Sequence, residues 1–473
     1  MKRIITYIPT LVFILLLGFS NQARADDTDW SGSWSGALNT PGGSLPLILV
    51  IDQSPEGALS AHMESPAQAP GQHIPIAEIT VIDGHMNFSI PALGASYVGQ
   101  WDGSEEHFSG QFTQGMTFDL VWARSSETEA AAALPVRPQY PTEPFGYVSE
   151  DIIFDNSQAD GVTLAGTLTL PQGEGPFPAA ILISGSGPQD RNEEVFGHKP
   201  FLVLADWLTR QNIAVLRYDD RGYGQSTGSH PGSTSADFAT DTNAAVSYLL
   251  SRPEVDASSI GVVGHSEGGL IGPLAALDNS DISYIILLAG PGIETPSLME
   301  MQRRRAAFAS GQTEEDLRQS QPIQDAVVNL ASSDLSNDEI AAEMRILLDE
   351  ETMTSMGLGA AERDALIART QDAWFRYFVR YDPAPVFAEI DLPILAINGS
   401  LDFQVEADPN LDGLRTILAD HDDATIIKLE GLNHMFQHAE TGSMREYALI
   451  EETFAPHAME LISDWINDRF GED

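Results

Sequence analysis

The chain has 473 residues, contains no cysteine and carries a formal net charge of −45 at pH 7. The length allows about two to three domains, and the lack of cysteine excludes disulfides, cysteine metal ligands and a cysteine nucleophile. A surface this acidic repels nucleic acid and anionic membranes and favours solubility in salty surroundings. We therefore expect neither nucleic acid nor a membrane surface as a partner.

Residues 1–25 have the pattern of a signal peptide. Lys2 and Arg3 precede a mostly apolar run over residues 4–19, and Ala23–Ala25 matches a small-residue cleavage site. The run is shorter than the about 20 apolar residues of a membrane span. We expect cleavage near Asp26 rather than an uncleaved anchor, and hence an exported protein, periplasmic or extracellular, without stable membrane insertion.

Residues 26–123 resemble an all-β domain, because short apolar runs alternate with turn signals and none has helical periodicity. The predicted strands are Leu45–Ile51, Ile76–Ile82, Met86–Ile90, Tyr97–Trp101 and Thr117–Trp122. A small barrel or sandwich fits. Its four tryptophans are expected in the core rather than in a ligand groove. Residues 124–144, with an alanine run and four prolines, are interpreted as a linker.

From residue 145 to residue 473 the pattern indicates an α/β domain. A hairpin is predicted over 152–170, followed by the strands 179–184, 213–218, 260–263, 284–289, 394–397 and 425–429 and by the helices 201–210, 238–250, 270–277, 411–418 and 447–468. Continuous apolar strands separated by amphipathic helices predict a doubly wound, mostly parallel sheet covered on both faces. The alternation is interrupted at residues 293–388, which we expect to form a helical cap over the carboxyl edge of the sheet.

The candidate nucleophile is Ser266 in Gly264-His265-Ser266-Glu267-Gly268, a G-x-S-x-G motif between a predicted strand and a predicted helix. Such a turn exposes the hydroxyl at the positive end of a helix. A second match around Ser226 lacks a following helix and is interpreted as a loop serine. The alternative for Ser266 is an inert residue in a glycine-packed turn.

A serine hydroxyl needs a base, and the base needs an orienting acid. In a doubly wound hydrolase the chain order is serine, acid, histidine, each beyond the carboxyl end of a strand. Asp402 follows the predicted strand 393–397 and His434 follows the strand 425–429, so these two residues are predicted as acid and base. His438 is the competing base, while a turn aspartate and a solvated loop histidine are the alternative readings.

The oxyanion hole needs two backbone N–H donors. Glu267 follows the nucleophile and is predicted to supply one of them. The glycine-rich loop after strand 179–183 is predicted to supply the other from Ser186, with Gly187 as the fallback and a simple Gly/Pro turn as the alternative. The loop lacks the lysine of a P-loop, which argues against phosphate binding.

Four motifs in this order resemble the α/β-hydrolase superfamily and, more narrowly, bacterial carboxylesterases of the serine-aminopeptidase-like branch that carry an N-terminal β domain. The motifs are Ser184–Arg191, Asp219–Ser226, Gly264–Gly269, and Asn398–Val405 together with Gly431–His434. The resemblance covers roughly residues 145–470 and implies a structural turn at Asp219–Ser226. Relatives usually have histidine in place of Ser184, which often braces the oxyanion loop, and a serine could do so through a shorter hydrogen bond.

The predicted activity is cleavage of a small-molecule acyl ester through an acyl-enzyme at Ser266, with no metal and no cofactor. The alternatives are an aminopeptidase-type peptidase, which needs acidic side chains for the substrate ammonium, and a non-catalytic binding protein. The tract Arg303–Arg305 is interpreted as a solvated helix face, with pairing to cap acids or to a substrate carboxylate as the other options. The sequence sets neither the acyl chain length nor the oligomeric state.

Overall fold

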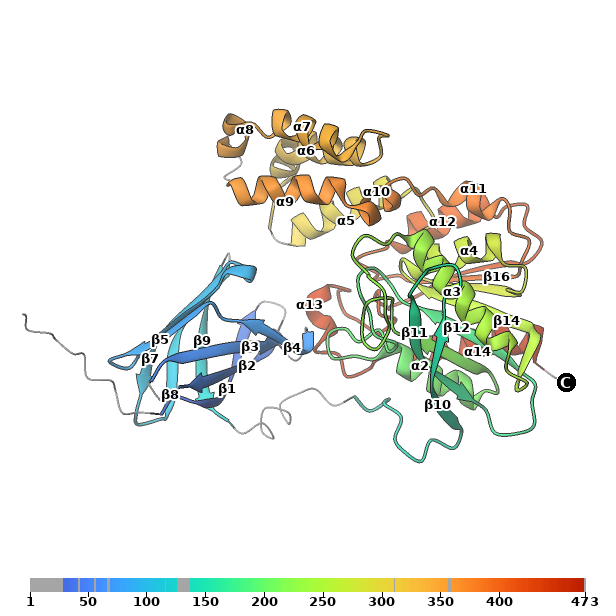
Figure 1. Cartoon of the computed structure of the whole chain (residues 1–473), viewed down its shortest axis with the longest axis horizontal. Helices are drawn as coiled ribbons and strands as arrows, with labels where there is room; N and C mark the ends of the chain where they lie inside the picture. The colour runs from blue at the N-terminus through green and yellow to red at the C-terminus, as the bar shows by residue number, and fades with distance from the viewer. Residues whose placement is uncertain are drawn as a thin grey trace, which may run out of the picture. The chain divides into compact units, whose positions relative to one another are not determined.

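The computed structural model describes residues 29–471, apart from residues 41–42, 55–56, 66–68, 115, 126–136, 310 and 356–358. The predicted signal peptide and much of the predicted linker lie outside these residues. The described chain forms two compact units, one containing most of an N-terminal antiparallel sheet and the other containing an α/β sheet with its helices (Figure 1).

The N-terminal sheet has nine strands in the order β4-β3-β2-β1-β9-β8-β7-β6-β5. The strands are β1 (Gly32–Thr40), β2 (Gly43–Gln53), β3 (Leu59–Ser65), β4 (Ala69–Pro75), β5 (Glu78–Ile82), β6 (His85–Ile90), β7 (Ala95–Asp102), β8 (His107–Gln114) and β9 (Met116–Arg124), with a short 3-10 helix at Pro91–Leu93. An all-β architecture is confirmed, as a single sheet. The sequence prediction missed β1, β3, β4 and β8, whose polar and small residues weaken the apolar signal.

Alternation along the strands buries one side of this sheet. In β7, Tyr97 is fully buried while its neighbour Val98 is 56% exposed. Trp34 and Trp122 are fully buried, and the rings of Trp30 and Trp101 lie 5.2 Å apart. The tryptophans therefore pack in the core, as predicted.

The α/β unit contains an eight-stranded sheet in the order β10-β11-β13-β12-β14-β15-β16-β17. Its strands are β10 (Val148–Asp155), β11 (Thr163–Leu170), β12 (Phe177–Ile183), β13 (Ala214–Tyr218), β14 (Val255–His265), β15 (Tyr284–Leu288), β16 (Ile394–Gly399) and β17 (Ala424–Leu429). The pairs β10–β11 and β11–β13 are antiparallel, and the remaining neighbours are parallel. The predicted doubly wound, mostly parallel sheet is confirmed.

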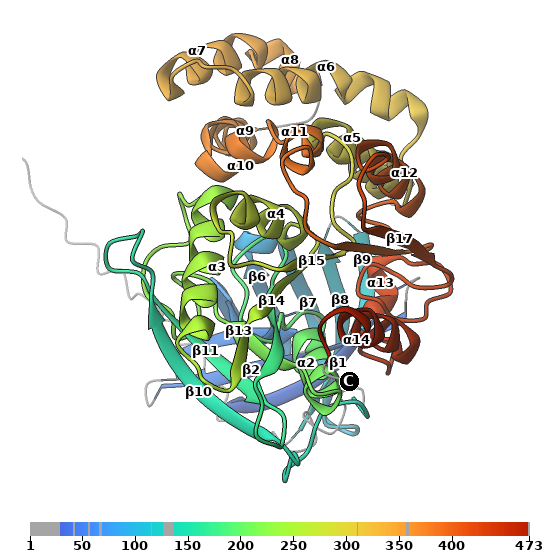
Figure 2. The ribbon, with the colours of Figure 1, turned by 90° about the vertical axis from the view of Figure 1, so that its right-hand side faces the viewer.

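Helices cover both faces of this sheet, because alternate strand residues belong to two separate cores. Ile181 and Ile183 of β12 pack with one core, and Ala180 and Leu182 pack with the other. The helices outside the cap are α2 (Pro200–Arg210), α3 (Ser235–Leu250), α4 (Gly268–Asp278), α12 (Ala407–Ile417), α13 (Met444–Tyr447) and α14 (Pro456–Phe470). Figure 2 shows α3 and α4 on one side of the strands and α2 with α14 on the other.

The C-terminal helix differs from the prediction. We expected one helix over residues 447–468, whereas α14 begins at Pro456 and the short α13 ends at Tyr447. A proline lacks the N–H needed inside a helix but is favoured at its first position. The proline therefore marks the start of α14 rather than an interior turn.

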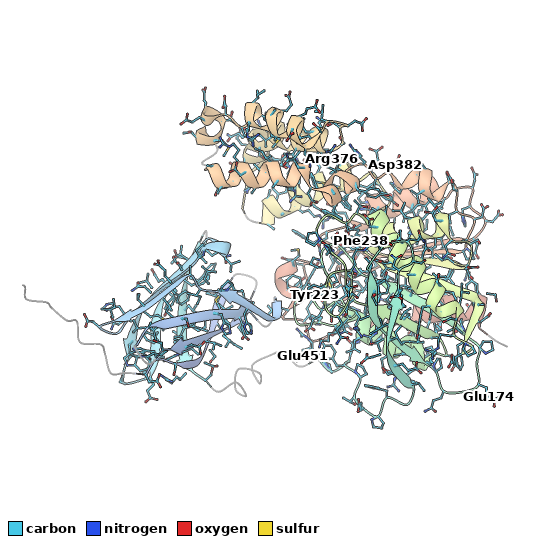
Figure 3. The ribbon with its side chains drawn as sticks, viewed as in Figure 1. Glu174, Tyr223, Phe238, Arg376, Asp382 and Glu451 are labelled. Atoms are coloured by element: carbon cyan, nitrogen blue, oxygen red, sulfur yellow. The ribbon has the colours of Figure 1, made fainter. Side chains whose placement is uncertain are left out.

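The residues between β15 and β16 form helices, as the predicted cap requires. They are α5 (Thr295–Ala309), α6 (Glu314–Ala331), α7 (Asn337–Leu347), α8 (Glu350–Ser355), α9 (Ala360–Gln371), α10 (Ala373–Phe378) and α11 (Pro383–Phe387). Helices α6 to α10 share a small core around Ile340 and Phe375, whereas Val386 and Phe387 of α11 pack with one of the two sheet cores. Arg376, labelled in Figure 3, donates to the carbonyls of Ser333 and Leu335 at 2.8 Å and so ties α10 to the α6–α7 connection.

No helix in the described ranges is long and apolar enough to cross a membrane.

Candidate active site

Ser266 lies at a sharp turn between β14 and α4. Its φ of 54° is in the left-handed region, which a residue with a side chain rarely adopts, and its N–H donates to the carbonyl of Leu288 at 2.8 Å. A side chain at Gly264 would place its Cβ 2.0 Å from the carbonyl oxygen of Gly268, and one at Gly268 would meet the carbonyl oxygen of Ile183 at 2.2 Å. The flanking glycines are therefore required for this turn, and the strained serine projects its hydroxyl at a helix N-terminus.

Asp402 and His434 meet beyond the carboxyl ends of β16 and β17. The Oδ2 atom of Asp402 lies 2.8 Å from Nδ1 of His434, and both side chains are buried, with 1% and 3% exposure. The other oxygen of Asp402 accepts the backbone N–H groups of Gln404 at 2.7 Å and Val405 at 2.8 Å. The carboxylate is thus fixed with one oxygen directed at Nδ1 of the His434 imidazole, so Nε2 is the ring nitrogen that does not face the carboxylate.

Ser266 and His434 line the same cavity, which has a volume of about 390 Å³. Ser186 and Glu267, the predicted oxyanion-hole residues, line it too. Asp402 reaches this cavity only through His434. The structure thus brings all five predicted site residues to one place at the carboxyl edge of the sheet.

The competing residues have other partners. The imidazole of His438 lies 2.8 Å from the Glu452 carboxylate, and this histidine is exposed. The Ser226 hydroxyl donates to the carbonyl of Asp219 at 2.7 Å and accepts the N–H of Ala165 at 3.0 Å. Both residues therefore have structural roles in loops and do not line the cavity.

The loop after β12 lies against the nucleophile. A side chain at Gly185 would place its Cβ 3.2 Å from Cβ of Ser266, so the neighbouring Ser186 is close to the serine. The hydroxyl of Ser184 donates to Oδ1 of Asp220 at 2.9 Å, and the N–H of Gln189 donates to Oδ2 of the same carboxyl at 2.8 Å. Ser184 therefore braces this loop through a hydrogen bond at the position where relatives usually carry histidine.

The Asp219–Ser226 turn holds the loop after β12 through hydrogen bonds. Asp219 accepts three hydrogen bonds from Arg191, at 2.8 to 2.9 Å, and a fourth from the N–H of Gln225. Burial raises the pKa of the neighbouring Asp220 to about 8, against the lowering effect of its two hydrogen-bond donors. The turn is a scaffold for the predicted oxyanion loop, in line with the structural role that the resemblance implies.

Cap residues form much of the cavity wall. Leu298, Met299 and Gln302 come from α5, Arg369 comes from α9, and Trp374, Phe375 and Phe378 come from α10. The Nε1–H of Trp374 donates to Oε1 of Glu267 at 2.7 Å, and the Ser235 hydroxyl donates to the same oxygen at 2.6 Å. The predicted placement of the cap over the site therefore agrees with the cavity lining, and α10 is linked directly to the residue after Ser266.

The interpretation of the tract Arg303–Arg305 as a solvated face is wrong. Arg303 pairs with Glu300 and Arg304 pairs with Glu314. Arg305 donates to the carbonyl of Asp402 at 2.8 Å and pairs with Glu406 at 2.6 Å. The tract therefore joins cap helix α5 both to its own neighbours and to the loop that carries the predicted acid.

Two buried residues of the site were not assigned a role from the sequence. Glu193 and His265 line the cavity and form a pair with 2.8 Å between Oε1 and Nδ1. His265 stands beside the nucleophile, so its position in the motif could have drawn attention to it. Glu193 has no such signal, because only the folded loop brings it to the site.

The order of the strands and the serine, aspartate and histidine placed beyond their carboxyl ends define the fold class as that of an α/β hydrolase. The model of a family described as serine aminopeptidase, S33, matches residues 199–353. The esterase EstD of Thermotoga maritima is 25% identical over 324 residues, which are 68% of this chain and 66% of that protein. Acyl-coenzyme A thioesterase 3 of Mus musculus is 32% identical over 126 residues, 26% of each chain.

Solved structures with a similar fold include an esterase of Pyrococcus furiosus, with a TM-score of 0.44 and 14% identity over 72% of this chain and 99% of that one. The α/β hydrolase GrgF of Penicillium sp. sh18 has a TM-score of 0.43 and 17% identity, covering 69% of this chain and 100% of that one. The chain thus spans just under two thirds of the Thermotoga esterase and about a quarter of the thioesterase. The sequence likeness is thus to proteins named as an esterase and as a thioesterase.

Proposed function

We propose that this protein hydrolyses carboxylic acyl esters through an acyl-enzyme at Ser266. The observation that carries the proposal is the buried 2.8 Å contact between Asp402 and His434 beside a strained serine that lines the same cavity. The contact fixes the Nδ1–H tautomer of His434, because the carboxylate accepts that proton. Nε2 is then left to accept a proton from the nucleophile.

In the proposed mechanism, His434 takes the hydroxyl proton of Ser266 as the serine oxygen bonds to the ester carbonyl carbon. The N–H groups of Ser186 and Glu267 stabilise the resulting oxyanion, a contribution of about 10²–10³ in rate per donor. His434 then protonates the departing alcohol. Water cleaves the acyl-enzyme by the same route and restores Ser266.

Ester cleavage is favoured over release of an N-terminal amino acid by the state of the two carboxylates in the cavity wall. Glu267 accepts hydrogen bonds from Trp374 and Ser235, and Glu193 is paired with His265. Each carboxylate has one oxygen engaged by protein groups and is only 3% exposed, which makes it a poor binding group for a substrate ammonium. An alcohol is also a better leaving group than an amine.

The test compares wild type with Ser266→Ala on p-nitrophenyl esters of increasing chain length and on aminoacyl p-nitroanilides. We expect ester turnover by the wild type, and a loss of at least about 10³-fold in the variant. Turnover of anilides but not esters would replace the proposal with a peptidase. Ester activity that survives in Ser266→Ala would contradict the assigned nucleophile, and an inactive wild type would favour a binding protein.

We also propose export through residues 1–25, on the pattern of the sequence. Expression of the full chain in a Gram-negative host followed by N-terminal sequencing should give a mature protein that begins near Asp26.

A further inference from the structure

A buried pair of side chains, Glu193 and His265, connects three loops of the site. The Oε1 atom of Glu193 accepts the N–H of Gly185 at 2.8 Å and lies 2.8 Å from Nδ1 of His265. On the other side of the ring, Nε2 of His265 lies 2.9 Å from the carbonyl oxygen of His434. Glu193 is 3% exposed and His265 is 6% exposed, so water does not compete for these contacts.

The partners of His265 define where its protons are. Both ring nitrogens face oxygen atoms, and the carbonyl of His434 can only accept a hydrogen bond. A neutral imidazole has a single N–H and could donate to only one of these two oxygen atoms. His265 is therefore assigned as an imidazolium, which donates from Nε2 to the His434 carbonyl and from Nδ1 to the Glu193 carboxylate. Burial lowers the pKa of His265, but the charge and hydrogen bond of Glu193 outweigh this effect, and the net pKa is raised.

The three loops held by the pair each carry part of the proposed machinery. Gly185 precedes Ser186, the predicted oxyanion donor, and lies against Ser266. His265 immediately precedes Ser266, and its ring centroid lies 4.7 Å from that of His434. A shift of Glu193 would therefore be transmitted both to the oxyanion loop and to the base.

Glu193 also has two features that reduce stability. Its φ of 52° is in the left-handed region, and its Oε2 atom is buried with no hydrogen-bond partner in the described part of the chain. A strained backbone and an unsatisfied buried oxygen each lower the stability of the folded protein. Costs of this kind are concentrated at functional sites, where the geometry matters more than stability.

We infer that Glu193 and His265 are positioning residues for acyl transfer. Together they fix the oxyanion loop and the loop of His434 at the distances from Ser266 that the reaction needs. This inference rests on the proposed function, because it assigns the pair a role in the same reaction. Neither side chain exchanges a proton with the substrate. The pair acts on the rate by fixing the distances between donors, nucleophile and base.

The test uses the variants Glu193→Gln, Glu193→Asp, His265→Gln and the double variant Glu193→Gln/His265→Gln. Glu194→Gln is the matched control, because Glu194 is the adjacent residue, is paired with Lys199 at 3.3 Å and does not line the cavity. For each protein we would measure kcat and KM on a p-nitrophenyl ester, the melting temperature, and the rate at which a fluorophosphonate labels Ser266.

We expect Glu193→Gln and His265→Gln each to lower kcat about 10- to 100-fold with KM changed less than about 3-fold. Because the two residues act as one unit, the double variant should be no slower than the slower single variant. Glu193→Asp, which keeps the charge, should recover part of kcat, and Glu194→Gln should match the wild type.

A folded Glu193→Gln variant with wild-type kcat and labelling rate would overturn the inference, as would independent, multiplicative losses in the double variant. A lower melting temperature with kcat unchanged below the transition would reduce the pair to a structural role. If either Glu193→Gln or His265→Gln does not fold, the kinetics of the other single variant test the inference. If the wild type cleaves no ester but fluorophosphonate still labels Ser266, the proposed function fails, while the labelling rates of the variants still test the pair.

Discussion

Asp402 shows how a single side chain sets the chemistry of its neighbour. One carboxylate oxygen is occupied by the two backbone N–H groups of Gln404 and Val405, so the other must serve His434. In Asp402→Asn the amide oxygen would take the place facing the backbone donors, and the NH₂ group would face Nδ1 of His434. That nitrogen would then have to accept, and the proton would move to Nε2, where it blocks the proposed base.

We therefore predict that Asp402→Asn lowers kcat by about 10³–10⁴-fold. The folded structure should persist, because the variant keeps the size and most hydrogen bonds of the acid. Steady-state kinetics on a p-nitrophenyl ester together with a thermal melt would check both statements. A loss smaller than about 10-fold would show that another group orients His434.

Asp220 predicts a dependence of stability on pH. Its pKa is raised from the ordinary 3.8 to about 8 by burial, so the folded protein keeps a proton that the unfolded chain releases. This group's contribution to the free energy of unfolding is fully present below pH 3.8, decreases as the pH rises, and is lost once the pH has passed through about 8. The change is on the order of a few kcal/mol.

Asp220→Asn should flatten this dependence, because an amide does not titrate. Urea unfolding at pH 5, 7 and 9 would measure it. The free energy of unfolding should decline from pH 5 to pH 9 more steeply in the wild type than in the variant. Equal slopes would show that Asp220 ionises normally in the folded protein.

The site residues that could be predicted from the sequence are those that come directly after a strand. Ser266, Asp402 and His434 each come just after a strand in a parallel sheet, and the carboxyl ends of such strands meet at one edge. Glu193 and Trp374 could not be predicted in this way. The first reaches the site through an irregular loop, and the second through packing of the cap, which depends on contacts far apart in the chain.

At the scale of elements, two cap helices are each hydrogen-bonded to the site through one polar side chain. Trp374 of α10 donates to Glu267, and Arg305 of α5 donates to the carbonyl of Asp402. The apolar periodicity of the sequence predicted that this insertion is helical. It did not show which face of each helix is turned to the cavity, because short amphipathic helices can pack on the sheet or on one another.

The Trp374 contact predicts an effect on substrate binding. Trp374→Phe would remove the donor to Glu267 but keep an aromatic wall, so α10 should be less firmly fixed over the cavity. We expect KM for longer-chain esters to rise about 3- to 10-fold, which corresponds to the loss of a typical hydrogen bond with a net contribution of about 0.7–1.4 kcal/mol, with a smaller change in kcat.

The matched control is Trp207→Phe. The indole N–H of Trp207 donates to Ser463 at 3.2 Å between α2 and α14, away from the cavity lining. This variant also loses one indole hydrogen bond and should keep the wild-type KM. An equal rise of KM in both variants, or none in Trp374→Phe, would contradict a role of this link in forming the cavity.

At the scale of the whole molecule, the excess of 69 acidic over 24 basic residues dominates the electrostatics. Many of the cations are already committed to ion pairs, such as Arg221 with Asp241 and Arg469 with Asp423. The remaining carboxylates repel one another across the surface of each folded unit, and unfolding moves them apart. With no cysteine to form disulfides, stability depends on the two sheet cores, which must outweigh this repulsion.

We predict that salt stabilises this protein, with a steep rise of the melting temperature at low concentration. The Debye length falls from about 30 Å at 0.01 M to about 10 Å at 0.1 M and 3 Å at 1 M, so repulsion between exposed carboxylates should be screened largely within the first few tenths molar. Thermal melts at pH 7 in 0.01 to 1 M NaCl would measure the curve, and the same series with sucrose would report stabilisation by exclusion alone. If screening is the cause, the melting temperature should rise with NaCl and then level off, and sucrose should raise it less. A melting temperature independent of salt would mean that the fold spaces its acidic groups widely enough for their repulsion to contribute little to unfolding.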